Sequence, residues 1–400
     1  MTQTIRTTVE REIADRFKIE RVVDGKPVSG LTVWDLQMRV GCAQVRMAGI
    51  GGVWTDPEHR KRGHSRAVLE RLLDFMVEEG FDVSLLFGIT DYYPRWGYAT
   101  VMADGTYRLV IPAESAQRAA SDLVVREMRR EADMSQVLAI YDTVSALRTG
   151  SVVRQATSGP RPLHKGTRWD TQVTVMVVED GEGEIIGYVA YDSVKSGDED
   201  ERTPILDRVD VAEVAATDER AYGAILAYLG RLAGERCAPS INVHIPPDDP
   251  FALHCRSFGV EQHAGSQADG GAMMRIVNLD SFLRKIELEL SRRVAGRGLS
   301  ASLGIATDIG AAELRIDGTG VRVADKSPTP DFALELEQWK LLQLVTGYRT
   351  LADVLSDPRD KAFPPGGQIA RKIGIPPGLQ AVCTALFPLQ WAYCWQSDRF

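Results

Sequence analysis

The chain is poor in cysteine, and its five cysteines are scattered along 400 residues. None of them forms a Cys-x-x-Cys pair, which is the spacing of many zinc sites and redox motifs. An odd, dispersed set also differs from the dense disulfide framework of small secreted domains. We therefore expect unpaired thiols, a reducing compartment and a cytoplasmic protein.

Long apolar runs are also missing. No stretch reaches the roughly 20 apolar residues that a membrane-spanning helix needs, and residues 1–6 lack the apolar core of a signal peptide. We expect no membrane partner. The net charge of −8 argues against a nucleic-acid partner and is compatible with a cationic small-molecule substrate.

Several common active-site motifs are absent from the sequence. It has no Gly-Lys-Ser/Thr phosphate loop and no Gly-x-Gly-x-x-Gly dinucleotide fingerprint. No Gly-x-Ser-x-Gly turn supports a serine hydrolase. The histidines lack metal-type spacing, including the pair His59 and His64, so we expect no bound metal.

What the sequence does contain is a strongly basic turn between an expected strand, which ends at Val53-Trp54-Thr55, and an expected helix. The helix is indicated by apolar residues at helical spacing from Val68 to Met76. A helix start offers unpaired N–H groups and the positive end of the helix dipole, so with basic neighbours it suits a polyphosphate. The turn reads His59-Arg60-Lys61-Arg62-Gly63-His64-Ser65-Arg66.

The spacing Arg60-x-x-Gly63-x-Ser65 resembles the Arg/Gln-x-x-Gly-x-Gly/Ala loop of the GNAT N-acetyltransferases. The resemblance implies that the loop amides hold the pyrophosphate of acetyl-CoA and that the preceding strand binds its pantetheine arm. Trp54 stands where the family has small or β-branched residues, so it either narrows the pantetheine path or faces the core. The implied acetyl-CoA-binding residues are Val53, Trp54, Thr55, Arg60, Lys61, Arg62, Gly63, His64, Ser65 and Arg66.

A second segment narrows the resemblance. A buried strand is expected at residues 84–87, and the run Tyr92-Tyr93-Pro94-Arg95-Trp96-Gly97-Tyr98 follows it. This run, the chain length, the early basic turn and the aromatic last residue, Phe400, are together similar to the enhanced-intracellular-survival (Eis) acetyltransferases. Gly88 and Ile89 stand where that family has a Ser-Glu pair in contact with CoA, so those contacts are not expected here.

The Eis resemblance implies an unusual pair of catalytic groups. Tyr93 matches the tyrosine proposed as the general acid, with Tyr92 as its nearest competitor. The terminal carboxylate of Phe400 matches the group that deprotonates the amine, with Asp398 as the alternative. The apolar, aromatic run at residues 388–395 indicates a packed chain end and not a frayed one.

The patterns along the chain indicate three consecutive domains. Residues 1–120 are expected to form an N-terminal GNAT domain with the acetyl-CoA site. Residues 121–285 are expected to form a central GNAT-like domain that has lost CoA binding, because Asp218 and Glu219 replace the basic turn and would repel a pyrophosphate. Residues 286–400 are expected to supply the terminal carboxylate. The predicted fold class is α+β: tandem GNAT-like α/β domains, the second degenerate, followed by a sterol-carrier-protein-like α+β domain.

Glycines interrupt the strand expected at residues 45–54, which suggests a bulge or a close backbone approach. In the GNAT fold such a break separates two parallel strands, and the pantetheine arm enters the gap. The other expected elements include strands at residues 31–40, 173–178, 185–191 and 209–214, a helix at about 220–235 and a hairpin at 312–324.

The leading hypothesis is an acetyl-CoA-dependent N-acetyltransferase that acts on primary amines of a polyamine-like or aminoglycoside-like small molecule. The acetyl group would pass directly to the amine through a tetrahedral intermediate. Two alternatives stay open, namely an acyl- or aminoacyl-transferase that uses another donor and a CoA-binding protein without catalysis. The Eis resemblance further implies a homo-oligomer, a hexamer.

Overall fold

The computed structural model describes residues 4–103, 107–154, 173–192, 207–324, 329–357 and 375–400. Contacts within the chain divide it into two compact units. The first unit combines Met1–Met102 and Gln267–Ala392 with Phe400, and the second combines Ala103–Ser266 with Tyr393–Arg399. The last residue therefore belongs to a different unit from the seven residues before it.

The described part of the first unit contains a seven-stranded sheet with the order β1-β2-β3-β4-β5-β14-β6. All neighbours are antiparallel except β4 and β5, which run parallel. β14 lies within the range predicted for the central domain, yet it pairs with β5 and β6 of this sheet. The strands are β1 (Ile5–Ile13), β2 (Arg16–Val23), β3 (Lys26–Val40), β4 (Ala43–Thr55), β5 (Val83–Gly88), β14 (Gly271–Ile276) and β6 (Ala99–Thr100).

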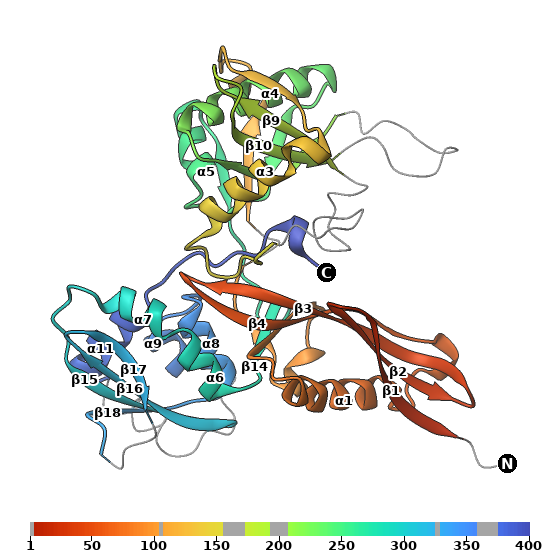
Figure 1. Ribbon diagram of the computed structural model, residues 1–400, viewed down its shortest axis with the longest axis vertical. Helices are drawn as coiled ribbons and strands as arrows, with labels where there is room; N and C mark the ends of the chain where they lie inside the picture. Colours follow the sequence, from red (N-terminus) through yellow and green to blue (C-terminus); the bar gives the residue numbers. More distant parts are fainter. Residues whose placement is uncertain (1–3, 104–106, 155–172, 193–206, 325–328, 358–374) are drawn as a thin grey trace. The chain divides into compact units, whose positions relative to one another are not determined.

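The helix α1 (His64–Glu78) connects β4 to β5 and packs on one face of this sheet (Figure 1). This crossover is what allows β4 and β5 to run parallel. Val68 and Leu72 are buried on the inner side of the helix, as their spacing predicted. The core beneath α1 includes Phe17 and Phe75, whose rings meet edge to face at 5.0 Å.

β4 and β5 diverge after a short stretch of pairing. Their ladder ends at Ile50 and Leu86. On the other side of β4, the ladder with β3 shifts register beside Gly30, opposite Gly52, whose φ is 57°. The bulge predicted in residues 45–54 is confirmed, and it lies where the two parallel strands separate.

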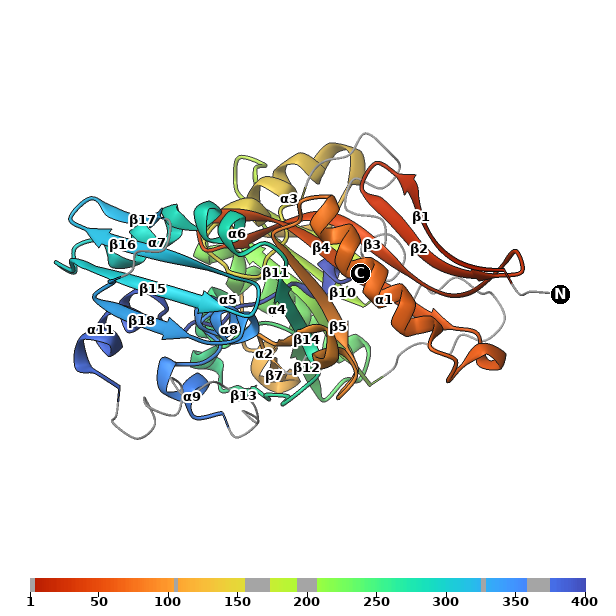
Figure 2. The same ribbon diagram turned by 90° about the horizontal axis from the view of Figure 1, so that it is seen from below.

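The C-terminal part of the first unit holds a four-stranded sheet with the order β17-β16-β15-β18 (Figure 2). Its β16–β17 hairpin confirms the hairpin predicted at residues 312–324. The likeness of this part to sterol carrier proteins stays a prediction. The strands are β15 (Ala301–Thr307), β16 (Gly310–Asp317), β17 (Gly320–Ala324) and β18 (Phe332–Glu335), and the helices are α6 (Leu279–Lys285), α7 (Glu287–Val294), α8 (Gln338–Val345), α9 (Leu351–Leu355) and α11 (Pro377–Leu386).

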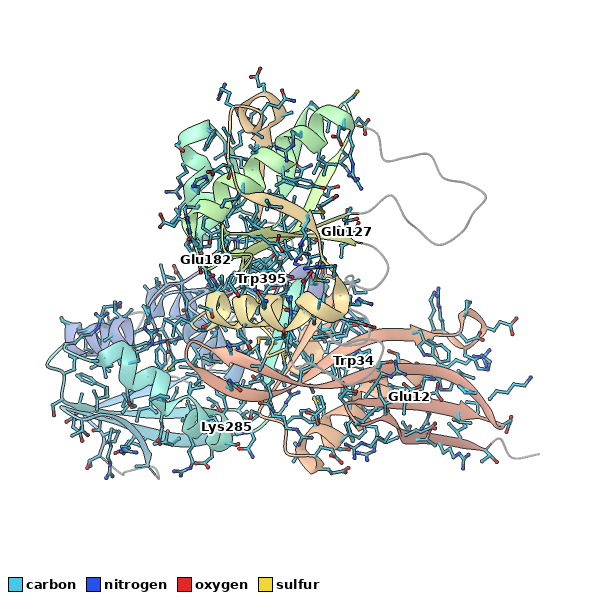
Figure 3. All side chains as sticks on the ribbon, turned by 45° about the horizontal axis from the view of Figure 1, so that its top comes forward. Glu12, Trp34, Glu127, Glu182, Lys285 and Trp395 are labelled. Atoms are coloured by element: carbon cyan, nitrogen blue, oxygen red, sulfur yellow. The ribbon has the colours of Figure 1, made fainter. Side chains whose placement is uncertain are left out.

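A buried carboxylate joins the seven-stranded sheet of the first unit to α6. Asp82 precedes β5 and is fully buried. It accepts hydrogen bonds from the Arg46 N–H and the Ser281 hydroxyl, both at 2.6 Å. Its second oxygen also lies 2.6 Å from Nζ of Lys285, which Figure 3 labels. The N-terminal and C-terminal segments are thus packed as one unit, which the sequence patterns did not indicate.

The described part of the second unit contains a seven-stranded sheet with the order β13-β7-β12-β11-β10-β9-β8. β11 and β12 run parallel and are joined by α4, which repeats the β4-α1-β5 arrangement. The predicted strands at residues 173–178, 185–191 and 209–214 are confirmed as β9, β10 and β11, and the predicted helix as α4. The strands are β7 (Arg108–Pro112), β8 (Val124–Glu127), β9 (Val173–Glu179), β10 (Ile185–Asp192), β11 (Val209–Ala216), β12 (Ser240–Val243) and β13 (Glu261–His263), and the helices are α2 (Ala113–Ala116), α3 (Arg130–Ser145), α4 (Glu219–Glu235), α5 (Pro250–Cys255) and η4 (Arg256–Phe258).

The helix α4 has 17 residues. Among the helices in the described ranges, none is both long and apolar enough to cross a membrane.

Candidate active site

A cavity of about 1090 Å³ opens in the first unit where β4 and β5 diverge. One wall is the end of β4 from Ile50 to Thr55, followed by the basic turn and the start of α1. The opposite wall is the end of β5 with the short helix η2 (Tyr93–Trp96), and Phe400 also lines the cavity. The residues singled out from the sequence therefore lie largely around one space.

The predicted phosphate-binding turn forms one end of this cavity. The chain turns through Lys61 and Gly63, whose φ values are 61° and 81°. α1 then begins at His64, and no side chain caps its first turn, so its first N–H groups lack an intrahelical acceptor. Of the seven predicted acetyl-CoA-binding residues in the turn, Arg62 is not among the residues that line the cavity. The other six line it, namely Arg60, Lys61, Gly63, His64, Ser65 and Arg66.

The charge at this end of the cavity favours an anion. Arg60 lies along the strand end, with Nε 3.4 Å from the Thr55 carbonyl oxygen, and its guanidinium is exposed. His64 is buried, and this burial lowers the pKa of its imidazole, so the ring is neutral at pH 7. The lasting positive charge therefore comes from Arg60, Lys61 and Arg66, with the helix start adding its dipole.

Val53, Trp54 and Thr55 all line the cavity at the end of β4. The hydroxyl of Ser29 donates to the Trp54 carbonyl oxygen at 2.8 Å and lies 2.8 Å from the Thr55 hydroxyl, which fixes this strand end on β3. The indole of Trp54 is 39 % exposed. It lies over Gly30, where a Cβ would come within 3.0 Å of Nε1. Trp54 thus faces the cavity and not the core.

The two candidate acids lie side by side at the start of η2. Their rings meet edge to face at 5.0 Å. Tyr93 is only 8 % exposed, and burial, with a smaller contribution from Tyr92, raises the pKa of its phenol. The Tyr92 hydroxyl is hydrogen-bonded to the hydroxyl of Ser65 in the first turn of α1. Tyr92 is therefore tied to the basic turn, whereas Tyr93 is the more deeply buried of the two.

Phe400 packs against the separated strands. Its ring centroid is 5.7 Å from that of Phe87 at the end of β5. A Cβ on Gly49 would come within 2.7 Å of the Phe400 ring, and a Cβ on Gly51 within 2.9 Å of the Phe400 carbonyl carbon. Glycine at these two positions makes room for the residue. The alternative carboxylate, Asp398, lies in the second unit and is not among the residues that line this cavity.

Sequence reasoning missed part of the cavity wall. Arg95 and Trp96 line it, and their place in the tyrosine-rich run was the available signal. Glu70 also lines it, but a charged residue on a helix surface is ordinary and gave no signal. Ile89, noted only as a departure from the family, is 68 % exposed and lies on the same wall.

The matching helix start in the second unit is built differently. Asp218 caps α4 by accepting a hydrogen bond from the Arg220 N–H at 2.9 Å, and it pairs with the Arg220 guanidinium at 2.7 Å. A carboxylate thus lies at the helix end, where the first unit offers uncapped N–H groups. Glu219 adds a second negative charge in the first turn.

Two segments of the chain match acetyltransferase family models. Residues 3–101 match one model and residues 150–276 match another, and both models describe an acetyltransferase (GNAT) domain. Together the two segments make up more than half of the chain. A search of curated proteins gave no significant match.

Solved structures share the fold along almost the whole chain. A GCN5-related N-acetyltransferase from Kribbella flavida is 21 % identical with a TM-score of 0.67, and the match covers 96 % of this chain and 87 % of that one. One from Anabaena variabilis is 17 % identical with a TM-score of 0.68, covering 96 % and 89 %. Eis1 from Mycobacterium abscessus is 20 % identical with a TM-score of 0.58, covering 96 % and 90 %. The two domain matches identify the chain as a GNAT-type acetyltransferase with two GNAT domains in tandem, and the solved structures show that it shares their fold.

Proposed function

We propose that the chain is an acetyl-CoA-dependent N-acetyltransferase that acts on primary amines of a polyamine-like or aminoglycoside-like small molecule. One observation carries the proposal: the basic turn before α1, Tyr93 and Phe400 all line the same cavity. A phosphate-binding end, a proton donor and a carboxylate are the groups that amine acetylation requires. The Eis resemblance and the net charge of −8 support a cationic substrate.

The cavity has features that suit acetyl-CoA. The uncapped first turn of α1, with Arg60 and Lys61 beside it, would hold the pyrophosphate. The strand end at Val53-Trp54-Thr55 would bind the pantetheine arm, so that the thioester points toward the gap between β4 and β5. The volume of about 1090 Å³ slightly exceeds the roughly 300–1,000 Å³ of a typical small-molecule pocket, which leaves room for an amine as well.

In this proposal the terminal carboxylate of Phe400 is the base. An alkylammonium has a pKa near ~10.4 and must lose a proton before it attacks the thioester. A terminal carboxylate has an ordinary pKa near ~3.5, but a group shielded from water becomes more basic. The Phe400 ring packs on Phe87, and its carbonyl carbon lies close to Gly51, which supports such shielding.

Tyr93 is the proposed acid. It would donate its phenolic proton to the thiolate of CoA as the thioester breaks. Because burial raises its pKa, Tyr93 stays protonated at neutral pH, as a proton donor must. Tyr92 is bonded to Ser65 instead, and in the proposal it holds the basic turn in place.

The remaining parts have proposed roles of their own. The central domain, predicted at residues 121–285, is proposed to have lost CoA binding, which the pairing of Asp218 with the first turn of α4 supports. The C-terminal domain, predicted at residues 286–400, is proposed to supply the terminal carboxylate. A hexamer follows from the Eis resemblance and a cytoplasmic location from the scattered cysteines, and both stay proposals.

Amine-dependent release of free thiol from acetyl-CoA tests this function. The assay uses a chain that ends at Phe400, with any tag at the other end, and compares aminoglycosides, linear polyamines and lysine peptides. Turnover is expected with the first two classes. Turnover confined to lysine peptides would overturn the substrate class. Tight binding of acetyl-CoA without turnover on any amine would favour the CoA-binding protein without catalysis or a transferase that uses another acyl donor.

A further inference from the structure

The short helix η2, which carries Tyr93, depends on other elements for its position. It has only four residues, too few to be stable by itself. It ends at Gly97, whose φ is 74° and whose N–H donates to the Pro94 carbonyl oxygen at 3.0 Å. The carbonyl oxygens of Trp96 and Gly97 accept hydrogen bonds from side chains of β14 and α8. These side chains therefore hold the end of the helix.

Gln338, the first residue of α8, makes one of these attachments. Its Nε2 donates to the Gly97 carbonyl oxygen at 2.5 Å, and its Oε1 accepts from the Ile276 N–H of β14 at 2.7 Å. The side chain is completely buried, where an amide has to use both of its polar ends. α8 itself packs against β14 (Figure 1). Gln338 thus ties the end of η2 to two elements of the same unit.

Arg275 of β14 makes the other attachment. Its Nη1 donates to the Trp96 carbonyl oxygen, and its guanidinium lies 6.0 Å from the centre of the Tyr98 ring, within the range of a cation–π contact. Tyr98 is 1 % exposed, and its hydroxyl lies 2.7 Å from the Ser84 hydroxyl on β5. The segment that follows Tyr93 is therefore anchored to β14 and to β5.

Tyr93 has little room to move independently of η2. Its ring centroid is 6.3 Å from that of Tyr98, and a Cβ on Gly88 would come within 2.6 Å of its Cδ2. A displacement of η2 would therefore carry the phenol with it. Misplacement of a catalytic group by about 1 Å can lower a rate by on the order of a hundredfold.

We propose that Gln338 and Arg275 are positioning residues for acetyl transfer, because they hold the end of η2 and thereby fix Tyr93 in the cavity wall. The inference rests on the proposed function, in which Tyr93 is the acid. Neither residue is among those that line the cavity, so each acts through η2 and not on the substrate. Through Gln338, the C-terminal segment supports the acid as well as the base.

The test uses Gln338→Met in the full-length chain, because methionine has a similar length and makes neither hydrogen bond. Hydrogen–deuterium exchange of the amides at residues 95–98, measured by mass spectrometry, reports how firmly the end of η2 is held, independently of catalysis. Exchange there should become roughly fivefold to tenfold faster. In the thiol-release assay, kcat should fall about tenfold or more, with the KM for acetyl-CoA within about threefold, because the basic turn is unchanged.

Gln343→Met is the matched control. Gln343 also lies in α8 and is 1 % exposed, but its Nε2 donates to the Thr100 carbonyl oxygen of β6, at 2.7 Å. The same substitution therefore removes a comparable buried bond and leaves the contacts of η2 in place. Both the exchange at residues 95–98 and kcat should stay within about twofold of wild type.

Arg275→Met is the second variant, for the case that Gln338→Met does not fold. Arg275 is only partly buried, and its replacement removes the bond to Trp96 while Gln338 keeps both of its bonds. Exchange at residues 95–98 should rise by roughly threefold to tenfold, and kcat should fall by a similar factor.

Exchange at the wild-type rate in both variants would overturn the positioning role, whether or not the chain acetylates amines. Equal losses of kcat in Gln338→Met and Gln343→Met would also overturn it, because the effect would then be a general loosening of α8. Faster exchange with an unchanged kcat would show that η2 is held but that its position does not limit the reaction, which again contradicts the role. Faster exchange with a lower kcat and an unchanged KM, without these changes in Gln343→Met, supports it.

A wild-type chain that releases no thiol with any amine would count against the proposed function itself. The exchange rates would then still decide whether Gln338 and Arg275 hold η2, so the two failures are distinguishable.

Discussion

At the scale of single residues, Tyr92 and Tyr93 are neighbours with different surroundings. Tyr93 is buried and its phenol has a raised pKa, whereas Tyr92 is bonded to Ser65. The change Tyr93→Phe keeps the ring packing and removes the proposed proton donor. We expect kcat to fall by roughly a hundredfold or more, with the KM for acetyl-CoA within about twofold, in the thiol-release assay.

Tyr92→Phe is the control for this change. It removes the bond to Ser65 at the start of α1, so its main effect should be a weaker binding of acetyl-CoA. A large loss of kcat in Tyr92→Phe and none in Tyr93→Phe would mean that Tyr92 is the proton donor and Tyr93 is not. The family resemblance put Tyr93 first and Tyr92 second, but no residue pattern distinguished the two, because adjacent residues differ in burial only once η2 is placed against the sheet.

The basic turn shows the same limit of sequence reasoning. The order of residues 60–66 predicted a phosphate-binding turn, and six of the seven line the cavity. Which basic residue is left out of the cavity lining depends on the turn geometry at Lys61 and Gly63, where φ is positive. Positive φ at a lysine is unusual, and no spacing rule predicts it. The exception, Arg62, therefore emerged only from the structure.

At the scale of elements, the start of α1 combines a dipole with side-chain charge. Arg60 lines the cavity and Arg62 is not among its lining residues, which gives a matched pair of variants. Arg60→Ala should raise the KM for acetyl-CoA about tenfold, because it loses a charge-assisted contact with phosphate. Arg62→Ala should change it by less than about threefold. Equal effects in both variants would mean that the turn acts only through general charge.

The N-terminal cap of α5 gives a second prediction at this scale. Asp249 caps it by accepting a hydrogen bond from the Phe251 N–H at 2.9 Å, and burial raises the pKa of Asp249 from 3.8 to about 6. The folded chain therefore holds this proton more tightly than the unfolded chain does. The stability that the protonated group contributes is full below about pH 4 and is lost as the pH rises through about 6.

The change Asp249→Asn keeps a capping side chain and removes the charge. The substitution should raise the free energy of unfolding, because it removes a buried charge. This increase should be larger at pH 8 than at pH 5, by on the order of 1 kcal/mol. Urea unfolding at both pH values measures this difference. The exposed neighbour gives the control Asp248→Asn, which removes a charge at the surface and leaves the Asp249 cap in place. A pH-independent effect of Asp249→Asn would contradict the raised pKa.

Local patterns predicted the strands β3, β4, β5, β9, β10 and β11 and the β16–β17 hairpin, because alternation and helical spacing are properties of short segments. The glycines of β4 even indicated where the sheet opens. The pairing of β14 with β5 was not predicted. In this pairing Gly271 lies opposite Gly88, and the two residues are far apart in the sequence. No local sequence signal specifies such a partner strand.

At the scale of the whole molecule, the end of the chain carries the most unexpected organisation. The aromatic run at residues 388–395 predicted a packed tail, and Trp395 is indeed buried. The buried pair of Arg154 with Asp398 spans 244 positions in the sequence and was not predicted. Asp398 attracted attention only as an alternative base, because a carboxylate near a chain end looks the same in sequence whether it is catalytic or structural.

In the proposed mechanism, the carboxylate of Phe400 works in the cavity that Tyr93 lines. Adding one glycine after Phe400 tests it most directly. The extension moves the carboxylate by about 3.5 Å, and Gly49 and Gly51 already leave no spare space around Phe400. Amine-dependent thiol release should fall at least about a hundredfold, while acetyl-CoA binds with a Kd within about threefold of the unextended chain. Equal turnover by the two forms would contradict the account.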